Sequence, residues 1–331
     1  MSEFLSLSFE EVLDRIASPA NTLILFHRGP DADAVGSAFA LKKVLTDLGS
    51  HAWCVCANEV PDRLLFLTDG KQESVLPEAI PSDFNATRII SVDTASPSQL
   101  GTLWDLYADR IDLMIDHHGM GEPYADHYIH PEAAATGELM FDLVKKLATD
   151  GQVEITDELC INLYAAISSD TGCFKYSNVT PLTHMAAASL VRSGIDAAEI
   201  NRLLFDAKSQ ARLKAERIGL ENLKTCCDGR VAIIALDYDE ITDAGVDTEE
   251  LDAFIDVARC VDGVEVAFAV KQHEKDGRFR VSMRSNGNVD VSEICALFGG
   301  GGHAKAAGCG IDENDKLAVV EKILRAVLER I

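Results

Sequence analysis

The sequence lacks any apolar run long enough to cross a membrane. No segment reaches the roughly 18 uninterrupted apolar residues that such a span requires. The first residues carry Glu and Asp where a signal peptide would carry Lys or Arg. These absences predict a soluble, cytoplasmic protein without a membrane partner.

Basic residues are scarce relative to acidic ones. The chain has 30 Lys and Arg against 54 Asp and Glu, which gives a net charge of −24. A protein that coats long DNA or RNA binds it through many Lys and Arg contacts to phosphates. The composition therefore argues against a long nucleic-acid partner, but it is compatible with a small phosphate ester held at one concentrated site.

Cysteine pairs with the spacing of a zinc or redox motif are missing. The nine cysteines include no Cys-x-x-Cys pair, and Cys54, Cys56 and Cys160 lie in apolar segments. We therefore expect mostly buried thiols in a reducing compartment, rather than a disulfide framework or a zinc site.

The composition that is present is that of a globular protein with two domains. The 331 residues exceed the roughly 250 to 300 at which single cores stop growing. The first half alternates short apolar runs with segments of helical period, which predicts an α/β domain with a mostly parallel sheet and flanking helices. The expected strands are 21–27, 51–56, 88–93 and 112–116, and the expected helices are 34–48, 135–149, 157–168 and 181–193.

The pattern changes in the second half of the chain. Residues 196–225 are polar with helical period, and they predict a linking helix or helix pair. A strand at 230–238, a hairpin of 264–273 and 277–285 across a Lys-Asp-Gly turn, and a closing helix at 315–331 predict a smaller α+β domain. We expect a first domain over 1–192, a helical linker over 193–225 and a second domain over 226–331.

Polar residues with the chemistry of metal ligands follow the first predicted strand. His27, Asp31 and Asp33 lie within seven residues, around a Pro-containing turn that enters a helix. Such a turn can present several hard ligands to one small volume. The alternative is an Asp that only caps the helix, and three candidate ligands in so short a segment weaken it.

Three more candidates follow at the ends of other elements. Asp93 ends a strand, where an Asp is more often a turn residue, and Asp116-His117-His118 ends the next strand. Adjacent side chains of an extended chain point to different sides, so we expect one histidine to face a metal while the other serves the substrate. Asp170 lies at a helix C-terminus, where the helix dipole disfavours a carboxylate unless a cation compensates it.

These residues together form a set of hard ligands without a thiolate. The six candidates are His27, Asp31, Asp33, Asp93, His117 and Asp170. The set exceeds one zinc site and suits two manganese or magnesium ions about 3.5 to 4 Å apart, a geometry that activates water and stabilises phosphoryl transfer. In open α/β sheets ligands bind at the carboxyl ends of the strands, where these residues fall.

The second domain contains a candidate site for an anion. Gly299, Gly300, Gly301 and Gly302 precede His303, and four glycines without side chains let backbone amides approach an anion directly. Arg284, followed by Ser285, ends the second hairpin strand and is suited to grip a phosphate. A flexible linker is the alternative for a glycine run, but linkers rarely lie inside a small domain.

The motifs resemble those of a known family. H-R-G-P-D-A-D-A-V-G-S, S-V-D-T-A-S, I-D-H-H-G and S-S-D-T-G-C-F-K-Y-S-N occur in this order in the first half. They resemble the four motifs of the DHH phosphoesterases. The segment V-S-M-R-S-N-G-N-V-D-V-S-E-I-C-A-L-F-G-G-G-G-H-A-K-A-A-G-C is similar to the first type of DHH-associated C-terminal domain. The resemblance covers residues 21–310 and is strongest to the nanoRNase branch.

The resemblance implies a role for each candidate. It places His27, Asp31 and Asp93 on one metal, and Asp33, Asp93, His117 and Asp170 on the other. The implied catalytic residues are His118, which would face the scissile phosphate, Asp93 between the metals, and Asp116, which would orient its neighbours or ligate weakly. The implied substrate-binding residues are Arg284, Ser285, Gly300, Gly301, Gly302 and His303. Arg28-Gly29, Ala32 and Ser169 depart mildly from the family pattern without removing a ligand.

The resemblance also implies an activity. We expect a phosphoesterase with two Mn²⁺, or with Mg²⁺ or another divalent cation in their place, that hydrolyses short oligoribonucleotides to 5′-mononucleotides and 3′-phosphoadenosine 5′-phosphate (pAp) to AMP. A homodimer is the assembly that the family suggests. The main alternative is a phosphodiesterase for the signalling dinucleotides pApA, pGpG or c-di-AMP. A manganese pyrophosphatase, a processive nuclease and a non-catalytic nucleotide sensor are weaker alternatives, the last because all six ligands are present.

Overall fold

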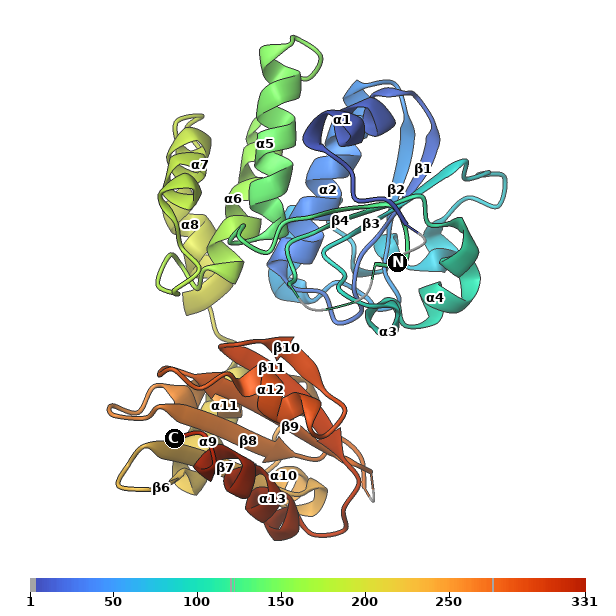
Figure 1. Cartoon of the computed structure of the whole chain (residues 1–331). Helices are drawn as coiled ribbons and strands as arrows, with labels where there is room; N and C mark the ends of the chain where they lie inside the picture. The colour runs from blue at the N-terminus through green and yellow to red at the C-terminus, as the bar shows by residue number, and fades with distance from the viewer. Residues whose placement is uncertain (1–3, 120, 122, 276) are drawn as a thin grey trace. The chain divides into compact units, whose positions relative to one another are not determined.

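The chain folds into two compact units. The computed structural model describes all residues except 1–3, 120, 122 and 276, and its units are Met1–Ala207 and Lys208–Ile331 (Figure 1). The boundary between them falls inside the segment 193–225 that was expected to link two domains. Each unit has its own sheet and its own hydrophobic core.

The first unit is built on a five-stranded parallel sheet with the strand order β2-β1-β3-β4-β5. The strands are β1 Asn21–Leu25, β2 His51–Val55, β3 Arg88–Val92, β4 Leu113–Asp116 and β5 His127–Ile129. The predicted parallel α/β architecture is confirmed. Sequence patterning missed β5, because three residues are too few to show a strand period.

Helices cover both faces of this sheet. Neighbouring residues of a strand point to opposite faces of the sheet. Ile24 therefore packs in the hydrophobic cluster on one face, and Leu23 packs in the cluster on the other face. One face is covered by α1 Phe9–Ala17, α2 Ala32–Asp47, α5 Thr136–Thr149 and α6 Asp157–Asp170, and the other by α3 Pro97–Leu100 and α4 Thr102–Tyr107 (Figure 1). The helices α7 Pro181–Val191 and α8 Ala197–Asn201 complete the unit. Strands buried on both faces explain the continuous apolar runs in the sequence.

The second unit is a mixed six-stranded sheet with the order β10-β11-β9-β8-β7-β6. Its strands are β6 Lys224–Cys226, β7 Val231–Leu236, β8 Val266–Lys271, β9 Phe279–Ser285, β10 Gly301–His303 and β11 Ala306–Ile311. Among the described strands of this second sheet, only β7 and β8 pair in parallel. The predicted α+β class and the antiparallel hairpin of β8 and β9 are confirmed, and the predicted Lys-Asp-Gly turn contains residue 276, which lies outside the described residues.

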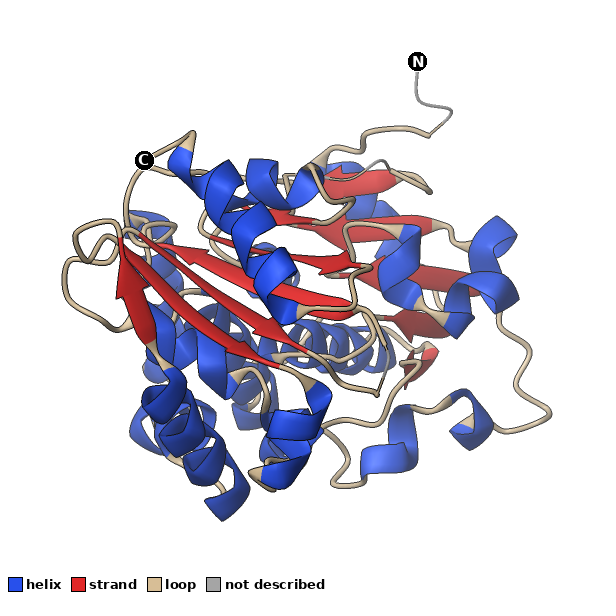
Figure 2. Cartoon of the chain, turned by 90° about the horizontal axis from the view of Figure 1, so that it is seen from below, coloured by secondary structure: helices blue, strands red, loops and turns tan. Residues whose placement is uncertain are grey.

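Helices also pack on both faces of the second sheet (Figure 2). One face contacts α12 Val291–Ala296 and α13 Lys316–Leu328, and the other contacts α9 Gln210–Asn222, α10 Tyr238–Asp243 and α11 Ala253–Arg259. The predicted helix pair at 196–225 is therefore α8 and α9, separated by a π-helical turn at Arg202–Asp206.

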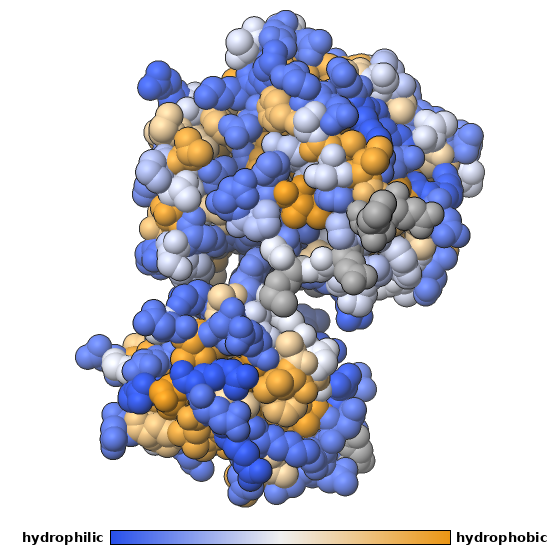
Figure 3. Space-filling view, in the orientation of Figure 1, coloured by the Kyte–Doolittle hydropathy of each residue, from blue (hydrophilic) through white to orange (hydrophobic). Residues whose placement is uncertain are grey.

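The faces of the two units that Figure 3 shows carry many polar residues. The visible faces are largely hydrophilic, with smaller apolar clusters between the charged residues (Figure 3). Among the helices that the structure describes, none combines the length and the apolar character needed to cross a lipid bilayer.

The contact between α2 and α6 holds together the two helices that carry candidate ligands. Gly36 of α2 faces α6 so closely that an added Cβ would lie 2.4 Å from the Asn162 carbonyl oxygen and 3.2 Å from Ala166 Cβ. Only glycine fits at this helix crossing without a backbone shift.

We expect Gly36→Val to lower the free energy of unfolding by about 1 to 3 kcal/mol, because its side chain overpacks the crossing. The urea midpoint of the first unit measures the loss. Ala188→Val, at an exposed position of α7, is the matched control and should change the midpoint little. An unchanged midpoint in Gly36→Val would contradict the tight contact.

Candidate metal centre

The candidate ligands of the first unit converge at one edge of the parallel sheet. His27 follows β1, Asp93 follows β3, and Asp116 ends β4. Asp31 and Asp33 lie at the start of α2, and Asp170 is the last residue of α6. Because parallel strands present their carboxyl ends at one edge, residues far apart in the sequence meet there.

Asp93 lies at the centre of this group. It is 2% exposed, and its carboxylate lies 3.6 Å from His27 Nε2, 3.8 Å from His117 Nε2 and 3.7 Å from His118 Nδ1. Its backbone has a φ of 52°, the left-handed region that non-glycine residues seldom adopt. Such a conformation costs free energy and persists where the surroundings enforce it, often at functional sites.

Asp31 serves the helix and the cluster at once. Its Oδ1 accepts hydrogen bonds of 3.0 Å from the backbone N–H groups of Asp33 and Ala34, so the capping interpretation of this residue holds. The same oxygen lies 3.7 Å from His27 Nε2. The Nδ1–H group of His27 donates a hydrogen bond to the backbone carbonyl oxygen of Arg28 at 3.1 Å. This bond directs Nε2 of His27 toward the carboxylates.

Asp33, His117 and Asp170 form the other side of the cluster. His117 Nε2 lies 3.9 Å from Asp33 Oδ2 and 3.1 Å from Asp170 Oδ2. Nδ1 of the same ring donates to the Ala133 carbonyl oxygen at 3.2 Å. This hydrogen bond fixes the ring so that Nε2 faces the carboxylates, as a metal-ligating histidine requires.

Asp116 holds His118 in place. Asp116 Oδ1 accepts from His118 Nδ1 at 2.6 Å and from the backbone N–H groups of His117 and His118 at 2.8 and 3.2 Å. Asp116 Oδ2 is buried and has no hydrogen-bond partner among the described residues. Asp116 forms a third group of candidate ligands with Asp93 and His118.

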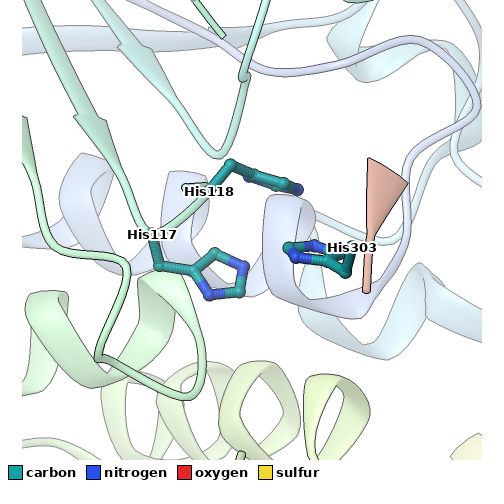
Figure 4. A group of neighbouring side chains, drawn as sticks. All are labelled: His117, His118 and His303. Carbon is teal, nitrogen blue, oxygen red and sulfur yellow. The ribbon is translucent and has the colours of Figure 1, made fainter. Parts of the chain in front are cut away.

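The two adjacent histidines differ from the expectation for an extended chain. Figure 4 shows His117 and His118 on the segment after β4, and their ring centroids are only 4.7 Å apart. Both rings approach Asp93 Oδ1. The prediction that they point to different sides was wrong, because β4 ends at Asp116 and its carboxylate turns the next two backbone N–H groups toward itself.

Sequence reasoning missed the residues that anchor two of the carboxylates. The N–H groups of Thr136 and Gly137, at the start of α5, donate to Asp33 at 2.7 and 2.8 Å, and Thr136 Oγ1 donates to Asp93 at 2.8 Å. Asn178 Nδ2 donates to the Asp170 carbonyl oxygen at 3.0 Å. The only signal was a helix start whose N-cap, Ala135, provides no side-chain cap.

The charges of the cluster are poorly balanced by the protein alone. Burial raises the pKa of Asp33 well above its usual range, and the neighbouring charges of Asp93 and Asp170 add to the rise. Burial also raises the pKa of Asp170 to about 6. Asp93 is buried too, but the hydrogen bond with His27 and the charge of His118 lower its pKa. The carboxylates are thus stable as anions only where positive charge lies beside them.

The donor set fits divalent cations. The first unit contains three groups of candidate ligands, and each group includes Asp93. Within each group the ligand atoms lie within 4.8 Å of one another. All donors are carboxylate oxygens or imidazole nitrogens, the ligands that hard and borderline cations prefer. The acidic residues and histidines are therefore placed for metal binding, and the buried, unpartnered Asp116 Oδ2 offers a further donor atom.

The second unit brings Arg284 and His303 onto one sheet face. Arg284 of β9 is paired with Ala306 of β11, which in turn is paired with His303 of β10, so the three residues form one row across the strands. Arg284 is partly exposed and His303 is exposed. Between them the face carries small residues, which leaves room for a ligand close to the backbone.

The three glycines of the predicted cradle differ in their surroundings. A Cβ at Gly300 would lie 2.2 Å from the Gly308 carbonyl oxygen, and one at Gly302, with φ +138°, would lie 2.5 Å from the Ala306 carbonyl oxygen. A Cβ at Gly301 would meet nothing within 4 Å. Gly300 and Gly302 are therefore required by the packing of β10 on β11, whereas Gly301 leaves its face of the strand open.

Ser285 is placed differently from Arg284. It is 6% exposed, it follows Arg284 along β9 and so lies on the opposite face, and its hydroxyl donates to the Gly287 carbonyl oxygen at 3.4 Å. A substrate contact of this residue stays a prediction.

We expect Asp93→Asn to lower the affinity for Mn²⁺ more than any single change elsewhere in the cluster, because Asp93 belongs to all three ligand groups of the first unit. Isothermal titration calorimetry of the metal-free protein measures the affinity. Asp105→Asn, on the exposed side of α4, removes the same charge and is the control. Equal affinities of the two variants would contradict a central role of Asp93.

Thr136→Val should weaken metal affinity about tenfold while leaving the fold intact. The valine keeps the shape of the side chain but cannot donate to Asp93, and loss of a hydrogen bond to a ligand typically costs 10- to 100-fold. The same titration measures it, with Thr136→Ser, which retains the hydroxyl, as the matched variant. Weak binding by both variants would point to packing and not to the hydrogen bond.

Two family models match the chain: the DHH family, N-terminal domain, over residues 21–167 and the DHHA1 domain over residues 228–331. The chain is 31% identical to the bifunctional oligoribonuclease and PAP phosphatase NrnA of Thermus thermophilus over 323 residues, 97% of this chain and 93% of that protein. It is 27% identical to the cyclic-di-AMP phosphodiesterase GdpP of Geobacillus thermodenitrificans over 90% of this chain and 46% of that protein. The structure of an exopolyphosphatase-related protein from Bacteroides fragilis has the same fold, with a TM-score of 0.85 at 23% identity over 99% of this chain and 98% of that one. The resemblance read from the motifs is confirmed, and the chain belongs to the DHH family.

Proposed function

We propose that the protein is a divalent-metal phosphoesterase that hydrolyses short oligoribonucleotides to 5′-mononucleotides and pAp to AMP. The observation that carries this proposal is the set of overlapping oxygen and nitrogen ligand groups that share Asp93 at one sheet edge. Overlapping groups with a common carboxylate suit a pair of cations, the arrangement of many phosphoryl-transfer enzymes.

We assign the ligands to two Mn²⁺ ions. His27, Asp31 and Asp93 would hold one, and Asp33, Asp93, His117 and Asp170 the other. This division follows the groups of atoms that lie within 4.8 Å of one another, with Asp170 added because its carboxylate lies 3.1 Å from His117 Nε2. Bound there, two such cations supply Lewis-acid stabilisation of a phosphoryl group and a nucleophilic water near neutral pH.

His118 would contact the phosphate that reacts. Burial opposes its charged form, but the hydrogen bond to Asp116 and the charge of Asp93 raise its pKa above the ordinary value. Because a carboxylate only accepts hydrogen bonds, Nδ1 of His118 carries the hydrogen that is donated to Asp116. The protonated ring then has Nε2–H available to offset negative charge that develops on a phosphoryl oxygen.

The second unit would bind the part of the substrate that does not react. Arg284, Gly301 and His303 lie on one face of its sheet, with a guanidinium and an imidazole beside an open stretch of backbone. Arg284 lies in the same row as His303, whereas Lys271, nearly buried on the same face, pairs with Asp252.

Two properties favour small substrates. The net charge of −24 opposes the many phosphate contacts that a long strand would need, whereas cations would concentrate positive charge at one place. The relative NrnA, named as an oligoribonuclease and PAP phosphatase, is similar over nearly its whole length.

Hydrolysis of a signalling dinucleotide is the second candidate, because the chain is also similar to the c-di-AMP phosphodiesterase GdpP.

With Mn²⁺ present, we expect turnover of pAp and dinucleotides to exceed turnover of a long RNA, and chelation to abolish all of it. Initial rates on pAp, a linear dinucleotide, c-di-AMP and long RNA compare the candidates. His118→Ala should lower kcat about 100-fold or more, the usual contribution of a positioned proton donor.

Turnover that rises with chain length would contradict the proposal in favour of a processive nuclease. A clear preference for c-di-AMP or pApA would favour the second candidate. If no substrate were hydrolysed, a nucleotide sensor would replace both. Self-association into a homodimer remains a prediction, which sedimentation velocity checks.

A further inference from the structure

Arg28 lies directly beside the cluster but is not part of it. It follows His27 at the end of β1, and its side chain is exposed. The ligand roles assigned above do not use it. Its position, next to a candidate ligand and open to solvent, makes it available to a molecule that reaches the cluster.

The backbone and the stem of Arg28 are fixed in place. Its backbone N–H donates to the Gln99 carbonyl oxygen at 2.7 Å. Its side chain runs past Gly101, between α3 and α4, where an added Cβ would lie 3.4 Å from Arg28 Cδ. His27 points instead toward Asp31 and Asp93. The side chains of these two neighbours therefore diverge, and the guanidinium is offset from the centre of the cluster.

The guanidinium has no protein partner. Among the described residues, none forms a hydrogen bond or an ion pair with it. In the same unit Arg15 pairs with Asp126, and Arg88 donates to Thr22 and to backbone carbonyl groups. The guanidinium of Arg28 is therefore free to contact an anion that reaches this edge of the sheet.

We propose that Arg28 binds a phosphate of the substrate other than the one that reacts. For pAp this is the second phosphate, and for a dinucleotide it is the terminal 5′-phosphate. This inference rests on the proposed function, and it adds Arg28 to the groups of the second unit that would bind the part of the substrate that does not react. It follows from the divergence of His27 and Arg28: one phosphate occupies the cluster, and a free guanidinium on the neighbouring residue is suited to hold a second phosphate in bidentate geometry.

A role of Arg28 in binding would require a substrate that carries a second phosphate. A ligand with two phosphates can satisfy the cluster and Arg28 together, whereas a ligand with one cannot. The 5′-phosphate should therefore improve binding of both pAp and a dinucleotide, through the same residue. Arg28 is thus a specificity residue for substrates that carry a second phosphate.

The test compares two matched substrate pairs: pAp against 3′-AMP, and pApA against ApA. In each pair only the 5′-phosphate differs. We expect Arg28→Ala to lower the ratio of kcat/KM values within each pair about tenfold or more, mainly through KM, as for loss of a charge-assisted contact at a partly solvated site. Arg28→Lys should retain part of the preference, because it keeps the charge without the fork.

Arg192→Ala is the control for charge alone, because it removes an exposed arginine at the C-terminus of α7. Its ratios should equal those of the wild type. If Arg28→Ala lowered activity equally on both members of a pair, or on neither, the inference would be wrong. Circular dichroism checks that the variants are folded.

Titration calorimetry with pAp and 3′-AMP gives a second readout that does not depend on turnover. Arg28→Ala should reduce the preference for pAp about tenfold, and an unchanged preference would overturn the inference. If the wild type hydrolysed neither nucleotide but bound pAp more tightly, and Arg28→Ala reduced this preference, the proposed function would be contradicted while the role of Arg28 would be supported. The two failures are therefore distinguishable.

Discussion

The position of the Asp93 carboxylate is the constraint on which the candidate centre depends. It ends a buried strand between two others and lies within 4 Å of ring nitrogens from His27, His117 and His118. Those rings come from the two strands that flank β3, so the parallel order of the sheet brings them together. A left-handed backbone at Asp93 turns the carboxylate into this space. Interactions around a single anion thus link the topology of the sheet to the chemistry at its edge.

The sequence was most informative where the fold follows from simple patterns. In the first unit, apolar runs located four of the strands. The rule that ligands gather at the carboxyl ends of strands then grouped His27, Asp93 and His117 correctly in space. The same reasoning could not find Thr136 and Gly137. Their contacts to Asp33 and Asp93 are made across more than 40 residues of chain, and they depend on where α5 begins relative to the sheet. The approach of the two histidines was missed for a related reason, since it depends on where β4 stops.

Structural and functional roles coincide in several residues. Asp31 caps α2 with the same oxygen that faces His27. Gly300 and Gly302 are required by the close approach of β11, yet they flank Gly301, which lies against open space. A helix cap and a tight strand pair therefore do not argue against a site, because they position the groups that a ligand would meet. The sequence can suggest both a structural role and a ligand-binding role for such a residue, but it cannot show how much each role contributes.

The hydrogen bonds from the start of α5 to Asp33 have a consequence for how ions would enter. Both oxygens of this carboxylate are held by groups of α2 and α5: Ser37, Thr136 and Gly137. The Asp33 carboxylate therefore keeps its orientation in the protein alone. Binding would then resemble the filling of a rigid receptor, in which the entropy of arranging the ligands was already lost during folding. The selectivity of such a receptor among cations would arise from its fixed dimensions more than from adaptation to each ion.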